Sequence, residues 1–108
     1  MKDNFVSITL NKNDNYFHLK ISNPTSEINI LLQEEELINL LTNINEAKRS
    51  ERKSIQAGQS ANANVYWCKE EEKICILIGQ DDETWVIGFI FETQIIHLIK
   101  KEFEEIKG

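Results

Sequence analysis

The order of hydrophobic patterns along the chain constrains its fold more than any other feature. Three short segments with the two-residue alternation of a β-strand, 6–10, 16–21 and 28–32, precede a segment with helical spacing at 34–47. The order then repeats, with strand patterns at 65–69, 74–78 and 84–91 and a helical pattern that begins near Thr93, a residue type suited to a helix cap. Such a chain is expected to contain two copies of a strand–strand–strand–helix unit.

Polar turns separate the strand patterns, and one longer polar segment separates the two units. That segment, 54–62, reads "SIQAGQSAN" and has the small, polar composition typical of a linker. The sequence therefore predicts one α+β domain over residues 1–108, with an internal repeat at 5–53 and 63–107. The two βββα units are expected to form antiparallel sheets packed with two helices, related by a pseudo-twofold axis.

Length and hydropathy indicate a cytoplasmic protein. The chain has 108 residues and no apolar run of about 18 that could span a membrane. Residues 1–5 lack the basic and long apolar regions of a secretory signal.

Cys68 and Cys75 lie on either side of a turn, where they could face each other as two small hydrophobic thiols in a reducing compartment.

The net charge of −6 is unevenly distributed. Residues 1–46 carry three lysines against seven acids, and residues from 64 onward carry five lysines against ten acids. Only the segment 47–63 is basic, with four cations against Glu51. An acidic body of this kind disfavours phosphate backbones and favours cationic partners.

No combination of residues predicts catalysis. His18 and His97 have no sequence neighbour suited to nucleophilic work, and the Cys and His residues lack the short paired spacings of a zinc site. Gly79 and Gly88 stand alone, so no phosphate-binding loop is visible. The sequence predicts a protein that is not an enzyme, with no catalytic residue, no metal ligand and no cofactor.

Single-stranded nucleic acid is the alternative partner. The βββα order resembles the Whirly and related single-strand-binding folds, and aromatic residues of the strands could stack on bases: Tyr16, Phe17, Tyr66 and Trp67. The strands supply few cations, namely Lys20, Lys69 and Lys73, and the basic segment 47–53 fits the polarity of a helix end. A nucleic-acid partner is therefore disfavoured.

The stretch 66–85, with the core "YWC…ICILIGQDDETW", resembles the immunity proteins of bacterial contact-dependent growth inhibition and related polymorphic toxin systems. This resemblance implies a protein that binds the C-terminal domain of a cognate toxin, often a basic nuclease such as a ribonuclease, and covers its active cleft with acidic residues. The pattern leaves open whether the protein is a monomer or a homodimer.

The expected toxin contacts combine acidic turns with tryptophan anchors. The first choice is the turn with Asp81, Asp82, Glu83 and Trp85; the second is the turn with Glu70, Glu71 and Glu72, together with Trp67.

Overall fold

One antiparallel sheet and two α-helices account for the fold of residues 6–80 and 85–107, which the computed structural model describes. The elements follow the chain as β1 (Ser7–Lys12), β2 (Phe17–Asn23), β3 (Ser26–Leu32), α1 (Glu34–Asn43), the 3₁₀ turns η1 (Ile44–Glu46) and η2 (Arg49–Glu51), β4 (Ile55–Ser60), β5 (Ala63–Glu70), β6 (Lys73–Gly79), β7 (Trp85–Glu92) and α2 (Gln94–Lys107). The strands lie in sequence order across the sheet, so each strand pairs with its neighbour in the chain.

The prediction of two βββα units is wrong, because all seven strands belong to one sheet and the second half contains four of them. The six predicted strand segments and both helices are present. The additional strand is β4, which occupies most of the segment 54–62 that composition indicated as a linker.

Small side chains allow β4 to enter the sheet. Ala57 is fully buried, and Gly58 has a φ of +92°, which side-chain-bearing residues rarely adopt. The pairing of β4 with β5 shifts register between Gln56 and Gln59, so this glycine lies in a β-bulge. A Cβ atom at Gly58 would lie 2.5 Å from a side-chain carbon of Ile30, so only glycine fits beside β3.

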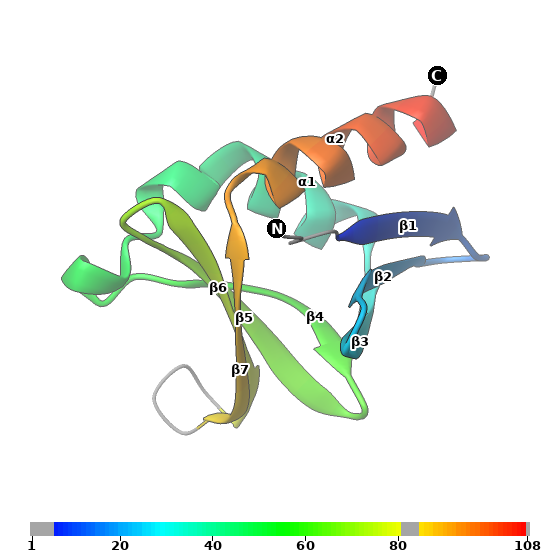
Figure 1. Ribbon diagram of the computed structural model, residues 1–108. Coiled ribbons are helices and arrows are strands. Elements are labelled where there is room, and N and C mark those ends of the chain that lie inside the picture. The colour runs from blue at the N-terminus through cyan, green and yellow to red at the C-terminus, as the bar shows by residue number, and fades with distance from the viewer. Residues whose placement is uncertain (1–5, 81–84, 108) are drawn as a thin grey trace.

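The sheet curls where β3 meets β4, with β1–β3 on one side and β4–β7 on the other (Figure 1). Only one residue pair, Leu31 with Gln59, is in register between these two strands in the described part of the chain. Helix α1 strengthens this thin junction, because the Glu36 carboxylate accepts hydrogen bonds from two backbone N–H groups: Gln33 at 2.8 Å, in a capping box, and Gly58 at 3.2 Å.

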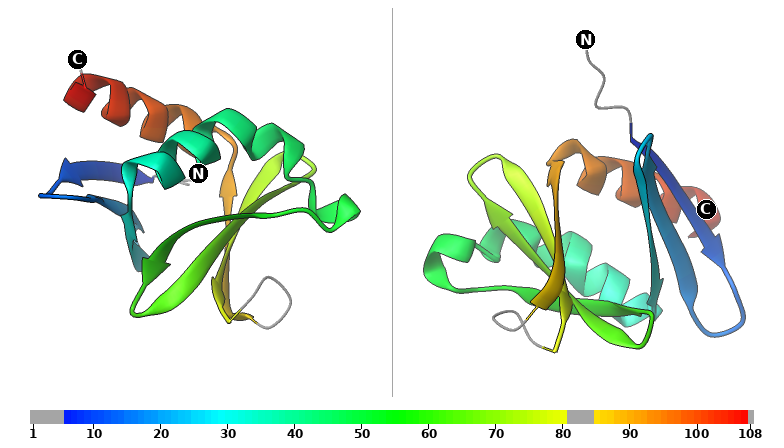
Figure 2. Two further views of the ribbon diagram at one scale, coloured as in Figure 1. Left: turned by 180° about the vertical axis from the view of Figure 1, so that it is seen from behind. Right: turned by 60° about the horizontal axis from the view of Figure 1, so that its bottom comes forward.

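Both helices lie across the same side of the curled sheet (Figures 1 and 2). Leu37 and Leu40 of α1, with Ile95 and Ile99 of α2, are fully buried in the hydrophobic core that residues from all the strands share. Helix α2 packs over β1. No helix in the described part of the chain has the length and apolar character needed to cross a lipid bilayer.

Replacing Gly58 by alanine is expected to lower the free energy of unfolding by at least about 2 kcal/mol, because the new methyl group meets β3 and the backbone is strained. The exposed β4 residue Gln56 is the control, and Gln56→Ala should change stability by no more than about 0.5 kcal/mol. Urea unfolding followed by circular dichroism measures both values. Equal stability of the two variants would contradict this account of β4.

Candidate functional site

The first-choice contact residues are not placed by the structure. Asp81, Asp82 and Glu83 lie outside the described residues. Trp85 begins β7, where its backbone pairs with Gly79, but its side chain also lies outside what the structure describes. Their role in binding therefore stays a prediction from the sequence.

Trp67 is part of the core and does not offer its ring to a partner. Its side chain is 0% exposed, and the indole Nε1 donates a hydrogen bond of 2.9 Å to the backbone carbonyl of Ala57. This carbonyl lies at the β4 bulge. The interaction therefore satisfies a buried polar group of the sheet, which gives Trp67 a structural role.

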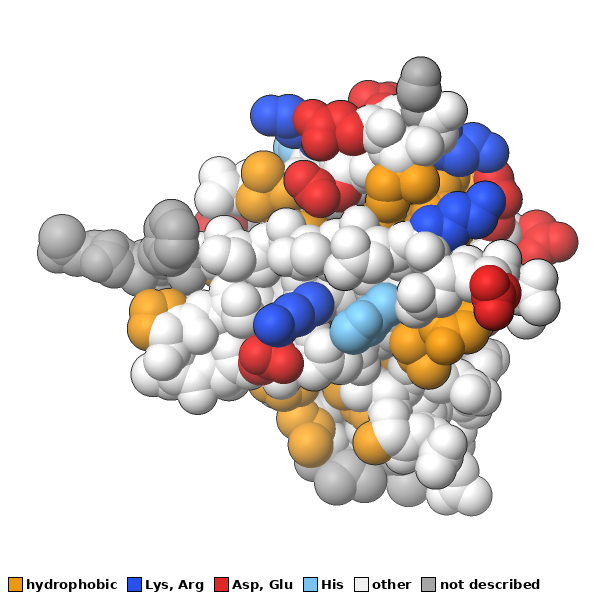
Figure 3. Space-filling model, turned by 90° about the vertical axis from the view of Figure 1, so that its right-hand side faces the viewer, with side chains coloured by type: hydrophobic (Ala, Val, Ile, Leu, Met, Phe, Trp, Pro, Cys, Tyr) orange, Lys and Arg blue, Asp and Glu red, His pale blue; other side chains and the backbone are white. Residues whose placement is uncertain are grey.

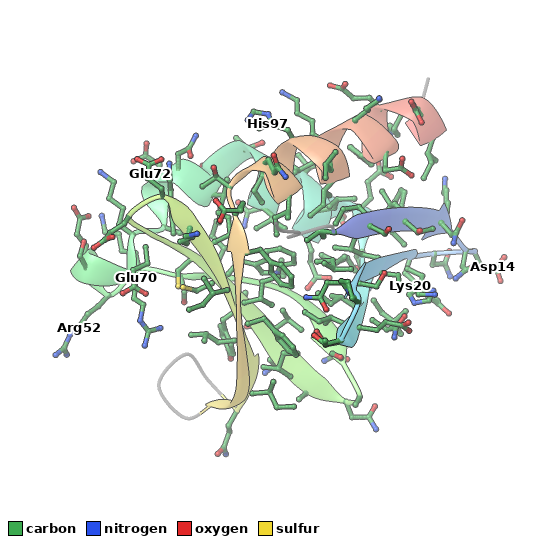
Figure 4. All side chains as sticks on the ribbon, viewed as in Figure 1. Asp14, Lys20, Arg52, Glu70, Glu72 and His97 are labelled. Carbon is green, nitrogen blue, oxygen red and sulfur yellow. The ribbon has the colours of Figure 1, made fainter. Side chains whose placement is uncertain are left out.

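The second-choice acids Glu70, Glu71 and Glu72 lie at the β5–β6 turn, and we call this turn the hairpin end (Figure 4). It is less acidic than the sequence suggested, because Arg49 of η2 and the preceding Lys48 lie beside it. Arg49 Nε is 3.9 Å from a carboxylate oxygen of Glu70. A hollow of about 630 Å³ beside the turn mixes both charges; it is lined by Lys48, Arg49, Ser50, Lys69, Glu70 and Glu71.

Cys68 and Cys75 face each other across β5 and β6, as the sequence suggested they could. Both are free and buried, on the opposite face of the sheet from the main core. Burial raises the pKa of both thiols, and at Cys75 burial, with Cys68 and Glu70 adding to it, raises the pKa to about 12. Both thiols stay protonated at neutral pH, which makes them poor nucleophiles.

A second surface, which sequence reasoning did not identify, combines exposed hydrophobic side chains with carboxylates. It consists of Asp14, Tyr16, Glu34, Glu35 and Ile38, and we call it the Tyr16 surface. Together with Lys12, Asn15 and Phe17, these residues line one hollow of about 450 Å³ between the β1–β2 turn and the N-terminus of α1. Tyr16 is 38% exposed and Ile38 is 45% exposed. Figure 4 places Asp14 at the opposite end of the molecule from Glu70 and Glu72.

Local structure holds the Tyr16 surface in place. The backbone N–H of Asn13 donates to the carbonyl of Tyr16 at 2.8 Å and closes the β1–β2 turn. Beneath it, Phe17 is buried and its ring meets Phe103 of α2 edge to face, with centroids 5.5 Å apart. The turn hydrogen bond and the ring contact thus hold the backbone that carries Tyr16 against the core.

The electrostatics of this surface are mixed but contain unpaired acids. Lys107 of α2 donates a hydrogen bond to Glu34, and this bond, together with the charges of Lys107 and Lys12, lowers the pKa of Glu34. Within the described part of the chain, no cation forms an ion pair with Asp14 or Glu35. Figure 3, which views this side of the molecule, shows hydrophobic side chains interspersed with acidic and basic ones.

The structure removes most of the features that favoured nucleic acid. Phe17 and Trp67 are buried, and the Tyr66 hydroxyl donates a hydrogen bond of 3.0 Å to the carbonyl of Gln80, so three of the four expected stacking residues serve the fold. Among the strand lysines, Lys20 lies 3.7 Å from Glu27, and Lys73 pairs with Glu92. These cations are therefore already partnered.

The two histidines lie on different elements, His18 on β2 and His97 on α2. His18 Nε2 lies 2.9 Å from the side-chain oxygen of Asn29 on the neighbouring strand, and His97 is exposed on α2 (Figure 4). Within residues 6–80 and 85–107, no group of three or more His, Cys, Asp or Glu residues could hold a metal ion.

Comparisons with protein-family models, curated proteins and solved structures found no match to the chain.

The raised pKa of Cys75 predicts a loss of stability in alkali. The unfolded chain releases this thiol proton near the ordinary pKa of 9.0, whereas the folded chain holds it until about 12. The stabilisation is therefore complete below pH 9 and is lost as the pH rises toward 12. Urea unfolding on both sides of pH 9 should show a smaller alkaline fall in Cys75→Ala than in wild type. Identical falls would show that this thiol does not contribute.

Proposed function

We propose that the protein is an inhibitor that binds a cationic toxin domain through the Tyr16 surface and covers the toxin's active cleft. The observation that carries the proposal is the 450 Å³ hollow, in which exposed Tyr16 and Ile38 lie beside the carboxylates of Asp14 and Glu35. Tyrosine is among the residues that most often dominate protein–protein binding, and a polar rim around such an anchor is typical of interfaces.

The charges of the protein support a cationic partner. The net charge of −6 attracts a positively charged domain over a distance comparable with the Debye length, which raises the rate of encounter. At contact, Asp14 and Glu35 are available to lysine or arginine side chains, since no described cation occupies them. Inhibition of this kind needs complementarity alone and no catalytic step.

The toxin class follows from the resemblance of residues 66–85 to immunity proteins. A nuclease that binds phosphates has a basic cleft, and a carboxylate surface can occupy such a cleft in place of nucleic acid. The cytoplasm is the compartment in which such a protein would meet a delivered toxin. The contacts expected at Asp81, Asp82, Glu83 and Trp85 belong to the same proposal and remain predictions from the sequence.

Two charge reversals of equal size distinguish the Tyr16 surface from the hairpin end. In the double variant Asp14→Lys/Glu35→Lys, the dissociation constant for the toxin domain is expected to rise at least about 30-fold, because cations then oppose the partner's cations. The matched control Glu71→Lys/Glu72→Lys changes the net charge equally at the opposite end, and its effect should stay below about threefold. Isothermal titration calorimetry measures both, with a basic ribonuclease toxin domain, sought among the genes beside the one for this chain, as the titrant.

Ribonuclease assays with the same proteins test inhibition itself, and thermal unfolding of each variant confirms that it folds. Loss of binding in the hairpin variant alone would show that the Tyr16 surface is not the binding surface. A wild-type protein that neither binds nor inhibits the neighbouring toxin domain would refute the inhibitor assignment. Tight, salt-sensitive binding to oligo-dT would instead support the nucleic-acid alternative.

A further inference from the structure

The cysteine pair of β5 and β6 is a chemically reactive feature that inhibition of a toxin does not use. Cys68 and Cys75 are directly opposite each other in the register of these strands, so their side chains leave the same face of the sheet. Opposite residues of antiparallel strands have Cα atoms about 4.5–5.5 Å apart, and disulfides form at Cα separations of about 4.4–6.8 Å. The backbone therefore holds the two thiols where a disulfide can join them without displacing either strand.

A charged pair acts differently on the two thiols. The Cys75 thiol donates a hydrogen bond of 3.4 Å to a carboxylate oxygen of Glu70, and Arg49 Nε lies 3.9 Å from the same oxygen. Burial raises the pKa of both thiols. At Cys68 a hydrogen bond from Arg49 and its positive charge oppose this rise in pKa, whereas at Cys75 the other thiol and Glu70 add to it. A thiolate therefore forms more easily at Cys68 than at Cys75.

The cysteine pair is buried but lies apart from the main core and beside open surface. With Leu77, Cys68 and Cys75 belong to a small separate cluster on the opposite face of the sheet. Arg49 and Glu70 line the 630 Å³ hollow at the hairpin end, and their side chains are 39% and 54% exposed. A small molecule in this hollow would lie beside the side chains that interact with the two thiols, and a bond between the thiols would leave the main core unchanged.

We propose that Cys68 and Cys75 form a reversible intramolecular disulfide by exchange with a small-molecule disulfide of the glutathione type, and that Cys68 attacks first. Both thiols are protonated at neutral pH, so the exchange is slow and records sustained oxidation. In a reducing compartment, disulfides that form are usually transient and serve catalysis or redox sensing. The site is separate from the Tyr16 surface, because Figure 4 places Glu70 at the opposite end of the molecule from Asp14.

The exchange proceeds through a mixed disulfide at Cys68. The Cys68 thiol loses its proton, and its sulfur attacks one sulfur of the small disulfide, whose S–S bond breaks; the departing thiolate takes up a proton. The Cys75 thiol then loses its proton and attacks the Cys68 sulfur, which releases the second small thiolate to become a thiol in the same way. Two electrons pass from the protein to the small disulfide, and the hydrogen bond from Cys75 to Glu70 is lost.

Mass spectrometry of the purified chain after incubation with excess oxidised glutathione, followed by alkylation, tests this exchange. Wild type is expected to lose two hydrogens and to carry neither an alkyl group nor glutathione on its cysteines, and dithiothreitol should restore both thiols. In Cys75→Ala the second step is impossible, so a glutathione adduct should accumulate at Cys68. In Cys68→Ala the adduct at Cys75 should form at least about tenfold more slowly.

Two further substitutions in the Cys75→Ala background test the part that Arg49 plays. Arg49→Gln removes the cation beside Cys68 and should slow formation of the adduct at least about threefold. The matched control is Arg52→Gln, which removes an equal charge from an exposed residue of the same segment and should change the rate by less than about 1.5-fold. An unchanged or faster rate in Arg49→Gln would show that the guanidinium does not select Cys68.

A wild type whose cysteines both remain open to alkylation would overturn the proposal, as would a stable glutathione adduct or a disulfide between two copies in place of the internal bond. Equal adduct rates at Cys68 and Cys75 would also contradict it, because thiols exposed only by global unfolding lose their neighbours and react alike. Thermal unfolding of each variant confirms that it is folded. No toxin enters these measurements, so failure of this proposal and failure of the inhibitor proposal are seen separately.

Discussion

The close approach of Gly58 to β3 is the constraint on which the rest of the structure depends. A Cβ atom at this position would meet the Ile30 side chain at 2.5 Å and the Leu31 carbonyl at 2.9 Å, so the backbone can pass only because no side chain is present. This contact joins two three-stranded meanders through β4 into one sheet. Without it, β1–β3 and β5–β7 would each present a free edge at the junction.

The same segment positions the elements around it. The bulge at Gly58 leaves the Ala57 carbonyl available to the Trp67 indole, and the Gly58 N–H is bound by Glu36 of α1. Helix α1 is thereby fixed over the junction, and its N-terminus lies beside the β1–β2 turn, where Tyr16 and Ile38 line one hollow. The candidate binding surface is thus a consequence of how the two halves of the sheet are joined.

Periodicity in the sequence identified the strands, in which large apolar residues alternate, and the helices, in which they recur at helical spacing. The sequence also suggested correctly that Cys68 and Cys75 could face each other. It missed β4 because the sequence "IQAGQS" contains few residues that favour strands. This segment joins the sheet because Gly58 has a positive φ and no side chain, and the need for both comes from the packing of Gly58 against β3 in the folded protein. The same limit applies to the Tyr16 surface, since Asp14 and Ile38 come together only through folding. Trp67 was misjudged because an aromatic side chain suits a core and an interface equally well.

Charge distinguishes the Tyr16 surface from the hairpin end. Within the described part of the chain, Asp14 and Glu35 form no ion pair, whereas Arg49 lies 3.9 Å from Glu70 at the hairpin end. Asp14 and Glu70 lie at opposite ends of the molecule (Figure 4). A cationic partner attracted by the net charge of −6 would therefore meet unpaired carboxylates at one end and a carboxylate that already has a cation beside it at the other.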